Sequence, residues 1–186
     1  MMELTYPEVQ SVVLVCSVAA HNAPDPTLES RLRRIANKLS SEVNITTPRG
    51  VVRRLTIPVE LSEEGVRTLI DAASLFNQAV SRGLNGMVIT PTFIKIREHI
   101  REVIVRLADK VPGVSPDMTP REILDATDNM PASDAVTALR TACTQMVDFE
   151  RECPTADSLV DYAASLVSAL ACRTVLTDDA LVELTR

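Results

Sequence analysis

The stretch LDATDNMPASDAVTALRTACTQMV, residues 124–147, is the part of the sequence that decides its interpretation. Acidic residues open it, Pro131 interrupts it, and a run of small side chains follows. In that run, apolar residues recur three or four positions apart, at Val136, Leu139, Cys143 and Met146. This spacing predicts an amphipathic helix over residues 132–152. The helix has little bulk, yet it carries Asp134 and, further along, Arg140.

Composition limits the class of protein. The chain has 186 residues, enough for one domain with a sizeable core. It contains two tyrosines, three phenylalanines and no tryptophan, so the core must be built mainly from aliphatic side chains and methionine. The formal net charge of −6 argues against a protein that coats duplex DNA through a basic surface. It leaves room for a local basic site.

The spacing of cysteine and histidine argues against a zinc site. The four cysteines form no CxxC pair, and the two histidines are far apart in the sequence. We expect no metal, no cofactor and reduced, buried thiols. The apolar segment 11–20 follows an acidic start without the positive charges of a signal peptide, and it is too short to span a bilayer. We interpret it as a buried strand and expect no membrane association.

Helical periodicity and capping residues dominate the rest of the chain. They predict a mostly α-helical single domain, resembling a four-helix bundle with extra helices and at most a small strand pair. We expect an N-terminal strand or arm over about 1–24, a helical core over about 25–172 and a C-terminal tail over about 173–186. Predicted helices start at Asp25-Pro26, Thr47-Pro48, Ser62, Thr90-Pro91, Thr119-Pro120, after Pro131, and at Thr155. An edge strand is predicted over 55–61, a turn and short strand over 83–90, and a last turn from Thr177.

No pattern of catalytic residues emerges. The sequence has neither a phosphate-binding glycine loop nor a GxSxG motif, and the histidines have no triad partner at a recognisable spacing. The acidic pairs Glu63-Glu64 and Asp178-Asp179 fall in helix first turns, where the helix dipole already accounts for them. We therefore expect a protein that is not an enzyme and has no small-molecule substrate.

Three features indicate binding or assembly. The small side chains of the 132–152 helix would let another backbone or a flat base approach closely, although tight helix packing explains them equally well. The helix over 91–110 is the most basic region, although its acids could make this a solvated face. Arginines at helix ends can bind phosphate, or can simply cap a helix. The RNA-binding candidates are Arg82, Lys95, Arg97, Arg101, Arg121, Ala135, Ala138 and Thr141.

The stretch LDAT…SDAVTALR resembles the inner-facing helix of tobacco mosaic virus-type coat proteins, where Leu-Asp-Ala-Thr is followed by Asp-Asp-Ala-Thr-Val-Ala-Ile-Arg. A second segment, DPTLESRLRRIANKLSSEVNITTPRGVVRRL, resembles the first two helices of that family. The order of the two segments agrees with the family. The chain departs from it where Asp128-Asn129-Met130-Pro131 replaces an arginine pair, in its low aromatic content, and in an extra helix over 91–110.

The resemblance implies a capsid protein that polymerises helically with copies of itself around single-stranded RNA, in a virion and in the host cytoplasm. Arginines would meet phosphates, and bases would lie on the small-residue helix. The resemblance further implies a structural ion pair between Asp134 and Arg140. It also implies carboxylates that face each other across subunit contacts, for which the candidates are Glu98, Glu122, Asp125 and Asp128. The alternatives are a helical protein–protein interaction module without nucleic acid, and an enzyme with an unrecognised site.

Overall fold

The most buried element of the protein is its first helix. The computed structural model describes residues 2–47, 50–83 and 89–178. Helix α1 (Tyr6–His21) buries residues on all its sides, so the strand predicted over 11–20 is wrong. A helix that is apolar all round has no period, and a short apolar run of this kind does not distinguish a buried strand from a buried helix. The carboxylate of Glu8 starts α1 by accepting hydrogen bonds from the backbone N–H and the hydroxyl of Thr5, at 2.7 and 3.0 Å.

The remaining helices confirm the mostly α-helical class expected from the sequence. They are α2 (Pro26–Val43), α3 (Glu63–Ser81), α4 (Ile89–Ala108), α5 (Pro120–Ala126), α6 (Asp134–Glu152) and α7 (Ala156–Asp178). The predicted capping residues of α2, α3 and α5 perform their role. For example, Asp25 accepts from the backbone N–H groups of Thr27 and Leu28, both at 2.9 Å.

Two short antiparallel strand pairs complete the described part of the fold. Strand β1 (Met2–Thr5) pairs with β4 (Thr56–Val59), and β2 (Asn44–Thr47) pairs with β3 (Gly50–Arg53). The predicted edge strand is confirmed, and Pro58 is tolerated because a two-stranded ladder has only edges.

Three predicted elements differ from the structure. The helix expected after Thr47-Pro48 is wrong at 50–53, where β-branched residues favour a strand; residues 48–49 lie outside the described part. The short strand expected over 83–90 is wrong at Ile89 and Thr90, which begin α4, and 84–88 lie outside. The predicted tail is helical over 173–178, and the turn expected from Thr177 otherwise lies outside.

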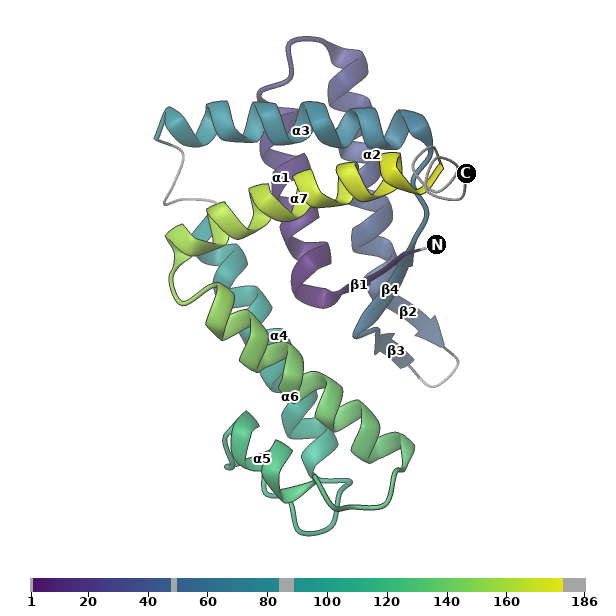
Figure 1. The fold of residues 1–186 in the computed structure, drawn as a ribbon, viewed down its shortest axis with the longest axis vertical. Helices are drawn as coiled ribbons and strands as arrows, with labels where there is room; N and C mark the ends of the chain where they lie inside the picture. Colours follow the sequence, from purple (N-terminus) through teal and green to yellow (C-terminus); the bar gives the residue numbers. More distant parts are fainter. Residues whose placement is uncertain (1, 48–49, 84–88, 179–186) are drawn as a thin grey trace, which may run out of the picture.

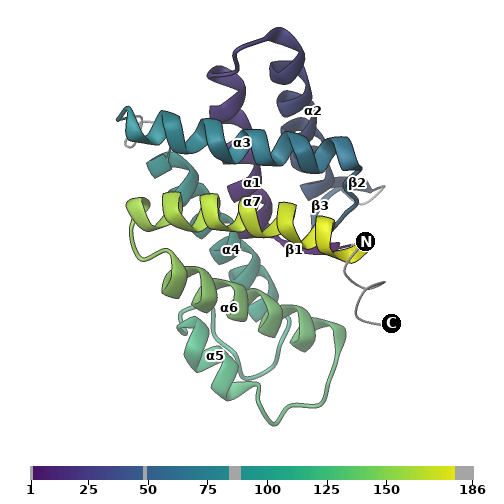
Figure 2. The same ribbon diagram turned by 45° about the horizontal axis from the view of Figure 1, so that its top comes forward.

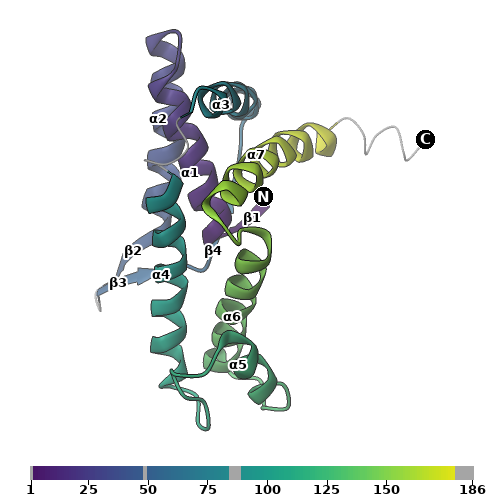
Figure 3. The ribbon, with the colours of Figure 1, turned by 90° about the vertical axis from the view of Figure 1, so that its left-hand side faces the viewer.

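The helices surround α1 and then extend away from it. Figure 1 shows α3 and α7 lying side by side across α1 and α2, and Figure 2 shows the same crossing after a turn of the molecule. In the side view of Figure 3, α2 and α4 lie on one side and α3, α7 and α6 on the other, with α1 between them. Helices α4 and α6 run together beyond α1, and α5 packs on the far part of α6. This arrangement leaves one long side of α4 open.

One continuous hydrophobic cluster joins these parts. It contains side chains from all seven helices and from β1 and β4, and its largest fully buried member is Phe76. The segment before β4 links α1 to α6, because the carbonyl oxygen of Leu55 accepts from the backbone N–H of Tyr6 at 3.1 Å and from Nε2 of Gln145 at 3.0 Å. The predicted apolar stripe of α3 is correct at Phe76 but not at Ile70, whose exposed fraction is 51%.

Helix α3 therefore offers a matched test of the core. Phe76→Ala should lower the free energy of unfolding by about 3–5 kcal/mol, because it removes a fully buried ring and leaves a cavity. Ile70→Ala on the same helix should change it by less than about 0.5 kcal/mol. Urea unfolding followed by circular dichroism measures both. Equal effects of the two substitutions would mean that α3 does not turn Phe76 inward and Ile70 outward.

Candidate interaction groove

A groove of about 540 Å³ lies between α4, the loop before α5, and α6. We call it the α4–α6 groove. Helix α4 provides one wall along most of its length, the loop and the start of α5 provide the second, and α6 contributes two residues. The lining residues are Phe93, Ile94, Arg97, Glu98, Arg101, Ile104, Val105, Pro116, Asp117, Met118, Thr119, Pro120, Met146 and Glu150.

Aromatic and charged contacts fix α4 against α6 at one end of the groove. The rings of Phe93 and Phe149 lie 5.6 Å apart between their centroids. Arg97 donates from Nη2 to Oε1 of Glu150 at 2.9 Å, and its guanidinium carbon stands 5.5 Å from the centroid of the Phe93 ring. Both charged side chains are about half exposed, so their ion pair contributes at most about 1 kcal/mol. Arg97 is nevertheless held in one place by two partners.

The groove has mixed charge and exposed apolar side chains. Arg97 and Arg101 share it with the carboxylates of Glu98, Asp117 and Glu150. Ile94 and Val105, which also line it, are 47% and 38% exposed. The α4 wall from residue 93 to residue 105 spans roughly 18 Å of helix. A long, open surface with these properties fits a macromolecular segment better than a small molecule.

The second wall of the groove depends on the start of α5. Oε2 of Glu122 accepts from the backbone N–H and the hydroxyl of Thr119, at 2.7 and 2.8 Å, and Oγ1 of Thr119 accepts from the N–H of Glu122 at 3.3 Å. These hydrogen bonds lower the pKa of Glu122, chiefly the one from the backbone of Thr119. The sequence made Glu122 a candidate for subunit contacts, but within one chain its carboxylate caps a helix.

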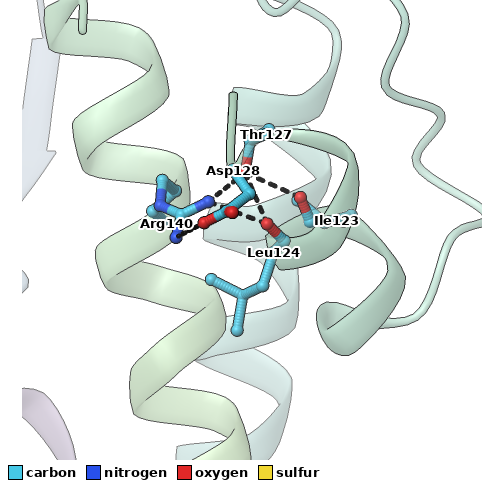
Figure 4. A network of polar contacts seen from close by, with 5 residues as sticks. All are labelled: Ile123, Leu124, Thr127, Asp128 and Arg140. Carbon is cyan, nitrogen blue, oxygen red and sulfur yellow. Dashed lines mark hydrogen bonds and ion pairs between the residues drawn. The ribbon is translucent and has the colours of Figure 1, made fainter. Parts of the chain in front are cut away.

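The guanidinium of Arg140 forms hydrogen bonds at the C-terminal end of α5 (Figure 4). Nη1 of Arg140 donates to the carbonyl oxygen of Leu124 at 2.7 Å and to Oγ1 of Thr127 at 3.0 Å, and Nη2 donates to Oδ1 of Asp128 at 3.3 Å. The Thr127 hydroxyl is buried and donates in turn to the carbonyl oxygen of Ile123 at 2.7 Å. A cation at the C-terminal end of a helix is favoured by the helix dipole as well as by these bonds.

The predicted ion pair between Asp134 and Arg140 is therefore wrong. Residues six apart on a helix point about 120° away from each other, so these two side chains cannot meet. Asp134 is exposed in the first turn of α6, after the capping residue Ser133, where an acid suits the helix dipole. Arg140 is instead paired with Asp128, one of the carboxylates that the sequence assigned to subunit contacts.

The small side chains of α6 are only partly covered by neighbouring helices. Helix α6 packs against α4 and against α5, and Ala142 is fully buried there. The three residues predicted to seat bases, Ala135, Ala138 and Thr141, are half-buried. The hydroxyl of Thr141 donates to the carbonyl oxygen of Thr137 at 2.9 Å. Close helix packing accounts for the buried part of this surface, in line with one of the two interpretations of the sequence.

The other predicted site residues are exposed but are not all brought together. Arg97 and Arg101 share the α4–α6 groove, and Arg121 directly follows the lining residue Pro120. Lys95 lines a separate cleft of about 290 Å³ that also contains Glu98. Arg82 caps the end of α3, in the opposite half of the molecule from α5, and Asp125 is exposed on α5 (Figure 1).

The three cysteines whose side chains the structure describes are not reactive thiols, and the described residues provide no metal cluster. Burial raises the pKa of Cys16 to about 12, that of Cys143 to about 11 and that of Cys153 to about 12, so all three are neutral thiols at pH 7. No group of three or more histidine, cysteine or carboxylate side chains within the described ranges could hold a metal ion. None of the described helices combines the length and the apolar character that crossing a membrane requires.

Comparison with known proteins identified no relative of this chain. No protein-family model, no curated protein and no solved structure matches the chain significantly. The resemblance to the rod-forming coat proteins consequently stays a prediction from the sequence.

Two carboxylates should differ in their coupling to Arg140. Arg140→Ala should lower the free energy of unfolding by about 1–2 kcal/mol, because it removes charge-assisted bonds at a site that is about one third exposed. A double-mutant cycle of Arg140→Ala with Asp128→Ala should show a coupling of about 0.2–1 kcal/mol, and a cycle with Asp134→Ala should show none. Urea unfolding measures both cycles, and coupling to Asp134 alone would overturn the assignment of Asp128 as the partner of Arg140.

The Glu122 cap should make α5 sensitive to acid. The folded state lowers the pKa of the Glu122 carboxyl. The ionised carboxyl therefore contributes to the free energy of unfolding at pH values above the ordinary pKa of glutamate, and this contribution is lost as the pH falls through the lowered pKa. Glu122→Gln should therefore destabilise the protein at pH 7 and match the wild type in strong acid. Unfolding free energies across this pH range test the point, with Asp125→Asn as the control. A difference that persists in strong acid would contradict it.

Proposed function

We propose that this protein is a structural subunit that assembles with copies of itself and binds single-stranded RNA, as a rod-forming viral coat protein does. The observation that carries the proposal is the α4–α6 groove, into which two of the predicted RNA-binding arginines, Arg97 and Arg101, both open. Arg121 directly follows Pro120 at the edge of the same groove. On this proposal the protein acts in the virion and in the host cytoplasm, and it carries out no chemistry of its own.

The charges of the groove suit a weak contact repeated many times. A strand of RNA held by one subunit would meet two arginines but also nearby carboxylates, so each subunit would contribute little affinity alone. In a polymer, contacts between subunits supply cooperativity along the strand, and a few phosphate contacts for each subunit are enough. The net charge of −6 is compatible with this arrangement, because the arginines act locally.

The second candidate is a helical protein–protein interaction module without nucleic acid. The carboxylates of Glu98, Asp117 and Glu150 outnumber the two arginines in the groove, and this mixture favours a partner of mixed charge over a polyanion. The exposed side chains of Ile94 and Val105 favour it as well, because a phosphate backbone gains little from an apolar surface.

Substitution of Arg97 and Arg101 should distinguish the RNA-binding coat protein from the protein–protein interaction module. In Arg97→Ala/Arg101→Ala protein, the nuclease-protected RNA that co-purifies should fall several-fold, while assembly of the protein alone should persist in electron micrographs. The loss of two phosphate contacts should also reduce the slope of log binding constant against log salt by about 1.4. Fluorescence anisotropy with labelled single-stranded RNA measures that slope.

A matched control removes the same charge elsewhere. Arg33→Ala/Arg34→Ala changes two exposed arginines of α2 and should leave both RNA content and salt slope unchanged. Wild-type protein that carries no protected RNA, and forms neither discs nor rods at any pH or ionic strength, would reject the coat proposal in favour of the interaction module. An equal loss of RNA binding in both variants would show that α4 provides no specific site.

A further inference from the structure

One exposed stripe of α4 has a pattern that is complementary to itself. We call it the α4 outer face; it consists of Ile94, Glu98, Arg101 and Val105. Their spacings of four, three and four residues place all four side chains within about 60° on one side of the helix. Ile94 and Val105 are two of the three exposed large hydrophobic side chains among the described residues. Glu98 and Arg101 are exposed between them.

The pattern has a centre between residues 99 and 100. Ile94 and Val105 are equally far from this centre on either side, and so are Glu98 and Arg101. When an identical helix is laid antiparallel on this face, each apolar residue meets the other apolar position and each charge meets its opposite. Each of these contacts is formed twice, as in an isologous interface.

The charges also select the direction of packing. In a parallel arrangement in register, Glu98 would face Glu98 of the second copy and Arg101 would face Arg101, and both contacts would be repulsive. Lys95 and Glu102 lie together on one flank of the stripe. In the antiparallel arrangement, Lys95 lies on the same flank as Glu102 of the second copy, about 3 Å from it along the helix axis. Two sets of charged contacts, Glu98 with Arg101 and Lys95 with Glu102, therefore favour the same direction.

We propose that the α4 outer face binds the same face of a second copy of this chain, antiparallel and about a two-fold axis. The part of this face from Glu98 to Val105 is accessible, because an open cleft of about 780 Å³ lies over Glu98, Arg101, Glu102, Val105 and Arg106. Figure 3 shows α4 along one side of the molecule, with α6 and α5 on its other side. The contact buries two apolar side chains from each copy and pairs the charges between them.

This dimer goes beyond the proposed function and does not depend on RNA. An isologous contact closes after two copies, whereas a rod grows through contacts that do not close. All four residues of the α4 outer face also line the α4–α6 groove, so the second copy and RNA compete for one surface. In particular, a phosphate and Glu98 of the second copy compete for the guanidinium of Arg101. The dimer is therefore the RNA-free form of the protein.

A charge swap tests the proposal on nuclease-treated, RNA-free protein. Glu98→Arg and Arg101→Glu should each raise the dimer dissociation constant by about tenfold or more, because each places like charges together at two symmetric positions. The double variant Glu98→Arg/Arg101→Glu restores opposite charges across the two-fold axis and should return to the wild-type dissociation constant. Sedimentation equilibrium measures all four proteins, and circular dichroism checks their folding.

Matched substitutions on α3 serve as controls. Ile94→Ser should weaken the dimer, because it removes an apolar contact at two symmetric positions. Arg67→Glu makes the same charge change as Arg101→Glu, and Ile70→Ser removes an exposed isoleucine as Ile94→Ser does. Neither α3 variant should affect dimerisation. A wild-type protein that stays monomeric at all accessible concentrations would overturn the proposal. So would single charge variants that dimerise like the wild type, or a double variant no better than the single ones. None of these outcomes bears on whether the protein packages RNA.

A disulfide test fixes the direction of packing. Ile94→Cys/Val105→Cys protein should form covalent dimers on mild oxidation, because position 94 of one copy lies beside position 105 of the other. The two positions are about 16 Å apart along one helix, so they cannot bridge within a chain. Each single variant should stay uncrosslinked, with Cys172→Ser included throughout. Crosslinking of a single variant to itself would indicate parallel packing and overturn the proposal.

Discussion

The constraint on which the rest of the structure depends is the burial of α1 on every side. A helix without a polar face is stable only when neighbours cover its whole circumference, and here α2, α3, α4 and α7 provide that cover. Each of these partners can then be amphipathic, since only the side that touches α1 must be apolar. Because α4 is longer than its contact with α1, its far part lies against α6 and the loop before α5 and keeps one side open to solvent.

Polar contacts at both ends of α5 help to stabilise that far part, together with the fully buried side chain of Ile123. Helix α5 has seven residues, too few to persist alone in water, and it depends on the Thr119–Glu122 cap at its start and on Arg140 at its end. Since the loop that leads into α5 forms one wall of the α4–α6 groove, the geometry of the groove depends on these contacts. The carboxylates of Glu122 and Asp128 therefore already make stabilising hydrogen bonds within a single chain.

Local signals in the sequence predicted the amphipathic helices and their starts, because capping bonds and helical periodicity involve only residues close in the chain. The same signals could not reveal α1 by periodicity, although the Thr5–Glu8 pattern before the apolar run is a helix-start signal. The partner of Arg140 lies across a turn, at Asp128, and only the packing of α5 on α6 brings the two together. Likewise, the spacing of Arg97 and Arg101 was visible in the sequence, but the groove requires a loop folded back from further along the chain.

The order of synthesis has a consequence for α1. Among the described helices it is synthesised first, whereas α7, which packs on both α1 and α3, is synthesised last. At ordinary translation rates, roughly ten seconds or more separate the appearance of these two elements. Throughout that interval, the apolar surface of α1 and α3 that α7 covers in the folded protein lacks this cover.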